Sequence, residues 1–174
     1  MASSDPYKDK NQDEPGTAQK IEDLSSFVKS SKFGMMTTRS GELLASRAMA
    51  VAGQEADGLD LIFHTNNQSG KTDDLSSDPH VNVSFINASG EWASISGLKA
   101  WLGDLGDGKH DGSENDPRIG VIKVEAKTAT YALAKGTMVG RAIEVVKGAV
   151  TGETANVNKL REISEQEIKQ HRGK

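Results

Sequence analysis

Apolar residues follow a helical spacing near the start of the chain and a strand-like spacing further on. Ile21, Leu24 and Val28 recur at intervals of three and four, which predicts a helix that begins near Thr17 and ends before Phe33. Beyond that point the apolar residues tend to alternate with polar ones. A period of two is typical of strands that bury one face.

The alternation is clearest over residues 80–86, where every second side chain is apolar. Segments of this kind are separated by glycine-, asparagine- and aspartate-containing turn signals. The other predicted strands cover residues 35–38, 43–51, 59–65, 92–96 and 119–124, with 129–133 as a weaker extension. Many short strands with tight turns predict a mainly β (α+β) fold built on an antiparallel barrel.

Both ends of the chain are polar. Residues 1–16 contain two prolines and many charges, so we predict a disordered N-terminal arm. Residues 151–174 predict a polar C-terminal tail, in which Leu160 and Ile163 dock weakly at most. A single domain over residues 17–150 is therefore expected.

Two segments late in that domain depart from the strand pattern. Residues 101–117 are rich in glycine and aspartate, which predicts a loop. Residues 138–150 place Val139, Ile143 and Val146 on one side of a predicted amphipathic helix.

Composition excludes several functional classes. The chain has 174 residues, a net charge of −4 and no cysteine, which excludes disulfides, thiolate metal sites and a cysteine nucleophile. No basic stripe predicts nucleic-acid binding. No apolar run suggests a secretion signal or a membrane span, so we expect a cytoplasmic protein. The histidines His64, His80 and His110 lack a metal-ligand spacing, so we expect no bound metal.

The segment after residues 59–65 contains candidate phosphate-binding groups. Thr65, Asn66, Ser69 and Lys71 combine polar donors and a positive charge with the expected start of a short helix near Ser69. A helix N-terminus presents free N–H groups and a partial positive charge, which suit an anion. The alternative is a strand, a turn and a capped helix with an exposed lysine, because short motifs often occur by chance.

Arg47 is a second candidate. Alternation places it on the same strand face as Ala45, Met49 and Val51. A guanidinium on an apolar face requires a carboxylate or a bound anion as partner, and its planar fork suits phosphate. The remaining alternative is that the side chain extends its apolar stem and reaches solvent.

Four motifs occur in a characteristic order. They are S-R-x-M, F-H-T-N-x-x-S-x-K, D-P-H-V-N-V-S-F and W-A-S-I-S-G, at residues 46–49, 63–71, 78–85 and 92–97. Together they resemble the FMN-binding split-barrel family that includes pyridoxamine 5′-phosphate oxidase and the general-stress-protein-26-like proteins. The later run WLGDLGDGKHDG…DPRIGVIKV resembles a fungal branch with blue-light-induced proteins.

This resemblance implies a six-stranded antiparallel split barrel with Greek-key topology and flanking helices. It also implies a homodimer with FMN at the subunit interface. Arg47 and Lys71 would hold the phosphate, while Ser69, Thr65 and Asn66 would bind the phosphate or the ribityl chain. The residues expected along the isoalloxazine ring are Ser46, Met49, the backbone of Phe63 and His64, Trp92 and Ser94 (from the partner copy), and Trp101 as a cover.

Two departures from the family pattern are visible. About twenty residues are missing after Gly97, judged by that resemblance, which could leave a barrel edge unpaired. The C-terminus, EIKQHRGK, lacks the arginine-rich substrate motif of true pyridoxamine-phosphate oxidases, which argues against vitamin B6 phosphate as the substrate.

Three functions remain open at this level. The first is an FMN-dependent oxidoreductase that takes electrons from NAD(P)H or a small molecule. The second is a non-catalytic flavin carrier or sensor of stress or light. The third is a dimeric interaction module without a cofactor. The residues do not distinguish FMN from F420 or haem.

Overall fold

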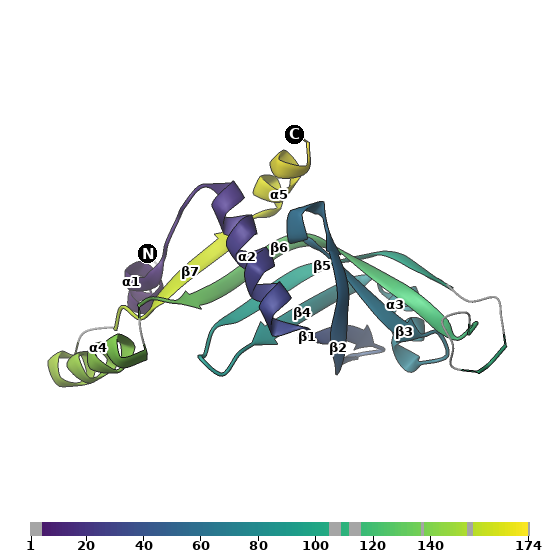
Figure 1. The fold of residues 1–174 in the computed structure, drawn as a ribbon, viewed down its shortest axis with the longest axis horizontal. Coiled ribbons are helices and arrows are strands. Elements are labelled where there is room, and N and C mark those ends of the chain that lie inside the picture. Colours follow the sequence, from purple (N-terminus) through teal and green to yellow (C-terminus); the bar gives the residue numbers. More distant parts are fainter. Residues whose placement is uncertain (1–4, 105–108, 112–115, 137, 153–154, 174) are drawn as a thin grey trace.

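The structure is a computed structural model that describes residues 5–104, 109–111, 116–136, 138–152 and 155–173. These residues form five helices and seven strands (Figure 1). The helices are α1 (Pro6–Asn11), α2 (Thr17–Ser31), α3 (Gly70–Ser77), α4 (Met138–Thr151) and α5 (Glu165–Arg172), with a short 3₁₀ turn η1 at Ala56–Gly58. The strands are β1 (Phe33–Ser40), β2 (Leu43–Glu55), β3 (Asp60–Asn66), β4 (His80–Ile86), β5 (Trp92–Asp104), β6 (Ile119–Ala134) and β7 (Asn158–Ile163).

Six of these strands form the predicted closed antiparallel barrel. The sheet order is β3-β2-β1-β4-β5-β6-β7, and an additional pairing between β3 and β6 closes the ring. The weak extension at residues 129–133 belongs to the same strand as residues 119–124. That strand, β6, is long because it pairs with β3 in its first half, with β7 in its second half and with β5 almost throughout.

Strand β5 continues beyond its predicted end at Ser96. Its register shifts at Ser96–Gly97, where a Cβ on Gly97 would collide with the carbonyl oxygen of Glu125 in β6. A glycine is therefore required for the two backbones to approach this closely. The loop expected over residues 101–117 starts only after Asp104; residues 105–108 and 112–115 lie outside the described part of the chain.

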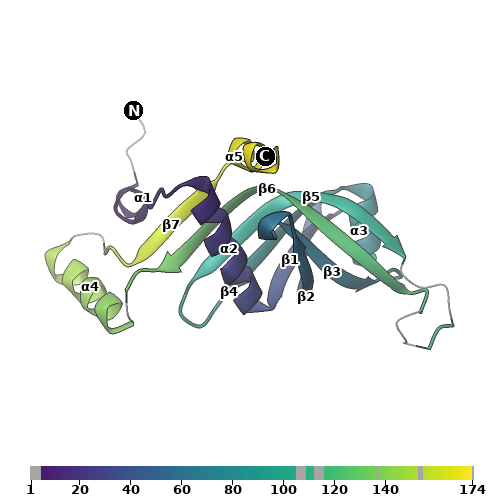
Figure 2. The same cartoon turned by 45° about the horizontal axis from the view of Figure 1, so that its top comes forward.

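The inward faces of the strands form one core, as the alternation predicts. Helix α2 lies across the barrel in both views of the fold (Figures 1 and 2). It contributes Leu24 and Val28 to that core. The largest fully buried side chains there are Tyr131, Phe63, Leu24, Met36, Leu59, Leu61, Leu75, Ile95, Ile122, Ile163, Ile168 and Val28. None of the helices in the described residues is long and apolar enough to cross a bilayer.

The structure corrects the prediction of a disordered arm and a polar tail. Residues of the N-terminal segment form α1, while the C-terminal segment forms β7 and α5. The Asn11 side chain is buried, and its Oδ1 accepts hydrogen bonds from the N–H groups of Val157 and Asn158, at 2.9 Å each. We call α1, residues 12–14, β7 and α5 the terminal clasp.

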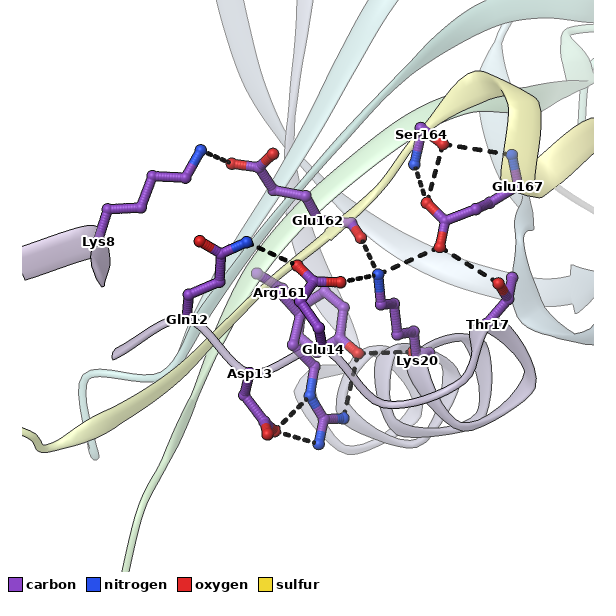
Figure 3. A network of polar contacts seen from close by, with 11 residues as sticks. Lys8, Gln12, Asp13, Glu14, Thr17, Lys20, Arg161, Glu162, Ser164 and Glu167 are labelled. Carbon is purple, nitrogen blue, oxygen red and sulfur yellow. Dashed lines mark hydrogen bonds and ion pairs between the residues drawn. The ribbon is translucent and has the colours of Figure 1, made fainter. Parts of the chain in front are cut away.

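Two buried cations join the terminal clasp to the barrel (Figure 3). Lys20, from α2, forms ion pairs with Glu14 and Glu167. Arg161, from β7, forms ion pairs with Asp13 and Asp23. Polar composition therefore does not indicate disorder here, because the two buried cations pair with carboxylates from distant segments.

Helix α4 confirms the predicted amphipathic segment. Its side chains Ile143, Val146 and Val150 are exposed rather than packed on the barrel. Both ribbon views place α4 at the end of the molecule near α1, away from α3 (Figures 1 and 2).

Candidate functional site

A pocket of about 530 Å³ opens where β3 ends and α3 begins. Its volume lies within the range of about 300–1,000 Å³ that is common for small-molecule sites. The lining residues are Met49, His64, Thr65, Asn66, Lys71, Asp116, Arg118 and Ile119. Five of them belong to the set that the sequence predicts for a flavin site.

Lys71 is the central cation of this pocket. Its Nζ donates a hydrogen bond to Ser69 Oγ at 2.7 Å, and across the described ranges no carboxylate forms an ion pair with it. Burial lowers the pKa of Lys71 below its ordinary value of 10.5, and the positive charge of Arg47 lowers it further. An anion in the pocket would relieve both effects.

The first turn of α3 gives Lys71 its position. Ser69 is the N-cap residue, with extended backbone dihedral angles, and its hydroxyl makes no capping hydrogen bond to the helix. The Thr72 N–H donates to the Ser69 carbonyl at 2.8 Å. The predicted helix start is therefore present, but the Ser69 side chain does not cap it, because its hydroxyl accepts the hydrogen bond from Lys71 instead.

Arg47 has a carboxylate partner in the structure. Its Nη2 donates to Asp74 Oδ2 at 2.8 Å, and its Nη1 donates to Thr38 Oγ1 at 2.9 Å. Asp74 lies one turn after Lys71 in α3, and hydrogen bonds from Ser40, Arg47 and Thr38 lower its pKa although burial opposes this. Arg47 thus lies close enough to Lys71 to affect its pKa, but the pocket lining does not include it.

Five other predicted residues have distinct environments around the pocket. Thr65 is buried and lines the pocket beside the exposed Asn66, the last residue of β3. His64 is exposed and also lines the pocket, although it lies on the opposite face of β3 from Thr65. The Phe63 side chain is fully buried in the core, so only its backbone could approach a ligand, as expected. Met49 is largely buried and forms part of the pocket floor.

The structure separates the remaining predicted residues from this pocket. Ser46 lies on the opposite face of β2 from Arg47 and Met49, where its hydroxyl pairs with Thr37 Oγ1 at 2.8 Å. Trp92 pairs with Ala132 of β6, whereas Thr65 pairs with Gly120 of the same strand.

A strand rises about 3.3 Å per residue, so these positions lie roughly 40 Å apart along β6. Ser94 is only two residues closer to the pocket and donates nothing to it; it accepts a hydrogen bond from Asn82 Nδ2 at 2.8 Å. Within one copy, Trp92 and Ser94 therefore do not share a site with Lys71. The side chain of Trp101 lies outside the described part of the chain.

Sequence reasoning missed two pocket residues that precede β6. Asp116 is 1% exposed and forms an ion pair with Arg118 at 2.6 Å. An arginine directly before a strand, two positions after an aspartate, is a visible signal in the sequence, although the glycine and aspartate content of the segment predicts the end of a loop. The barrel closure between β3 and β6 brings this segment next to Asn66.

The closed six-stranded barrel with a cationic pocket at the start of α3 defines the class as a split-barrel protein. Solved structures with the same fold include a putative general stress protein 26 from Jannaschia sp. CCS1, with a TM-score of 0.62 and 15% identity over 84% of this chain and 99% of that one. Another is a pyridoxamine 5′-phosphate oxidase-related, FMN binding protein from Nostoc punctiforme PCC 73102, with a TM-score of 0.52 and 12% identity over 84% of this chain and 95% of that one.

Residues 19–156 match the family described as pyridoxamine 5′-phosphate oxidase like, and the chain belongs to this family. A relative, Protein bli-3 of Neurospora crassa, is 52% identical, with 97% of this chain and 91% of that protein covered. Their alignment spans 191 positions, more than the 174 residues of this chain, so the relative contains residues without a counterpart here. This agrees with a missing segment; its place after Gly97 stays a prediction.

Proposed function

We propose that this protein binds FMN and that the pocket beside α3 holds the phosphate. The observation that supports this most directly is Lys71, a half-buried ammonium without an ion pair in the described ranges. A buried cation is stable in its charged form only when an anion or several acceptors surround it. Burial and, to a smaller extent, the charge of Arg47 lower its pKa, and a bound anion would counteract both effects.

A phosphate dianion matches the other groups of the pocket. Thr65 and Ser69 offer hydroxyl donors, and the α3 N-terminus adds a partial positive charge. Arg47 contributes through its charge, although Asp74 shares its guanidinium. Met49 and His64, beside the phosphate groups, would lie toward the ribityl chain and the ring.

A second copy of the chain would complete the site around the isoalloxazine ring. Met35, Ser84 and Ser94 are cross-strand neighbours on the outer face of the barrel, so their side chains share that face. The exposed apolar residues Leu44 and Ile86 lie on it as well. A homodimer through this face would bring Trp92 and Ser94 of one copy toward the flavin of the other.

We infer an oxidoreductase activity, because a bound flavin supplies the electron chemistry while the protein binds and orients it. The electron donor is expected to be NAD(P)H or another small molecule in the cytoplasm.

The phosphate assignment is tested by titrating FMN and riboflavin against the purified chain and following flavin fluorescence. Lys71→Ala should weaken FMN binding by about 1.5–3 kcal/mol, the usual contribution of a charged hydrogen bond, and leave riboflavin binding unchanged. Lys147→Ala is the matched control, because Lys147 is exposed on α4. Equal affinities of the wild type for FMN and riboflavin would contradict the assignment.

Turnover is tested with the FMN-loaded protein under anaerobic conditions. NADH or NADPH should bleach the flavin absorbance, and an added acceptor should restore it. A flavin that is bound but not bleached by either nucleotide would contradict the oxidoreductase proposal and favour a carrier. Sedimentation of the same sample tests the dimer, which predicts twice the chain mass of 18.6 kDa.

A further inference from the structure

We propose that Arg118 is a further anion-binding residue of this pocket, held by Asp116 so that one of its nitrogens is free for the ligand phosphate. This inference rests on the proposed function and extends it to a residue that neither the sequence motifs nor the family resemblance assigns. It begins from the observation that Arg118 and Lys71, separated by 47 positions, line the same pocket.

Asp116 binds one edge of the Arg118 guanidinium. Nε of Arg118 donates to Asp116 Oδ1 at 3.0 Å, and Nη2 donates to Oδ2 at 2.6 Å. This arrangement uses one edge of the planar group. In the described residues Nη1 has no hydrogen-bond partner, and the Arg118 side chain is 37% exposed.

Hydrogen bonds also fix the backbone of Arg118. Its N–H donates to Asp116 Oδ1 at 2.9 Å, and its carbonyl accepts from the Asn67 N–H at 2.8 Å. Gly120 allows this contact, because a Cβ there would collide with Asn67 Oδ1. The turn after β3, which leads to Lys71, and the turn before β6 are therefore joined directly.

The buried carboxylate has a positioning role in this arrangement. Asp116 is 1% exposed, so its charge is compensated by Arg118 rather than by water. The pair is close to neutral overall, and Arg118 would contribute directed N–H donors more than net charge. Lys71, without a carboxylate partner in the described ranges, would supply the charge. A phosphate monoester requires both, because it is a dianion with several acceptor oxygens.

The test compares the ratio of the riboflavin and FMN dissociation constants in five variants. Arg118→Gln should reduce this ratio about tenfold, the lower end of the effect of one charged hydrogen bond. Asp116→Asn should reduce it by a smaller factor, because the guanidinium keeps its charge but loses its orientation. Lys147→Gln, at an exposed lysine of α4, should leave the ratio unchanged.

Lys71→Ala separates the possible outcomes. If Lys71→Ala reduces the ratio and Arg118→Gln does not, the phosphate site stands and the role of Arg118 is refuted. If neither variant changes the ratio, the proposed function itself fails. Thermal melting of each variant identifies loss of folding. Arg118→Lys is a second variant at this position, which keeps the positive charge next to Asp116 and should therefore fold. It should retain only part of the riboflavin-to-FMN ratio, because lysine cannot use one edge for Asp116 and another for phosphate.

Discussion

The Glu167 carboxylate joins the terminal clasp to the barrel. Its Oε2 accepts hydrogen bonds from the N–H and the hydroxyl of Ser164, at 2.8 Å each. Its Oε1 accepts from Lys20 Nζ at 3.1 Å and from Thr17 at 3.2 Å. We predict that Glu167→Gln destabilises the fold, because glutamine keeps the capping geometry but loses the charge.

The magnitude follows from the pKa of this carboxyl. Burial acts to raise it, but the hydrogen bonds from Ser164 and Lys20 outweigh burial and lower the pKa from 4.5 to about 2. That difference corresponds to about 3 kcal/mol of stability at pH 7. Since glutamine retains part of the hydrogen bonding and the side chain is 26% exposed, we expect a loss of about 2 kcal/mol.

The direction of the pKa shift determines how the stabilisation by Glu167 changes with pH. The folded-state pKa lies below the unfolded value, so the ionised carboxylate stabilises the fold above pH 4.5 and this contribution is lost as the pH falls toward 2. The difference between wild type and Glu167→Gln should therefore shrink over this window. Urea unfolding at pH 7 and pH 3 measures it.

Glu165→Gln is the matched control for this experiment. Glu165 lies in the same first turn of α5, but its side chain is half exposed and pairs only with Lys169. Its replacement should change the unfolding free energy little at either pH. An equal loss in both variants, or a Glu167→Gln loss that is the same at pH 7 and pH 3, would refute the proposed role of the Glu167 carboxylate.

Three further predictions concern other parts of the molecule. Arg161→Met should lower the unfolding free energy by about 3 kcal/mol, because the buried guanidinium compensates Asp13 and Asp23; urea unfolding would contradict this if the variant matched the wild type. Gly97→Ala should cost about 1–3 kcal/mol, because its Cβ would force β5 away from Glu125; an unchanged melting temperature would show that the bulge tolerates a side chain. FMN affinity should fall as the pH rises through the lowered pKa of Lys71, because only the protonated amine attracts phosphate, whereas riboflavin affinity should stay constant; parallel curves for both flavins would exclude Lys71 as the phosphate cation.

The sequence by itself determined the barrel and the local part of the candidate site. Alternation over β4 predicts a strand buried on one face, and the structure confirms residues 80–86 without a change of limits. The strand, turn and helix around Lys71 could also be predicted, because the residues that form them are adjacent in the chain.

Only the tertiary structure decided which charges meet. Arg47 needed a partner on any interpretation, but the choice of Asp74 depends on how α3 packs against the barrel. Lys20 and Glu167 are 147 positions apart, and Arg118 reaches the pocket only through the pairing of β3 with β6. Apolar periodicity reports which face of an element is buried, whereas an ion pair between distant segments leaves no periodic signal. For this reason the sequence predicts a disordered arm and a polar tail where the terminal clasp forms.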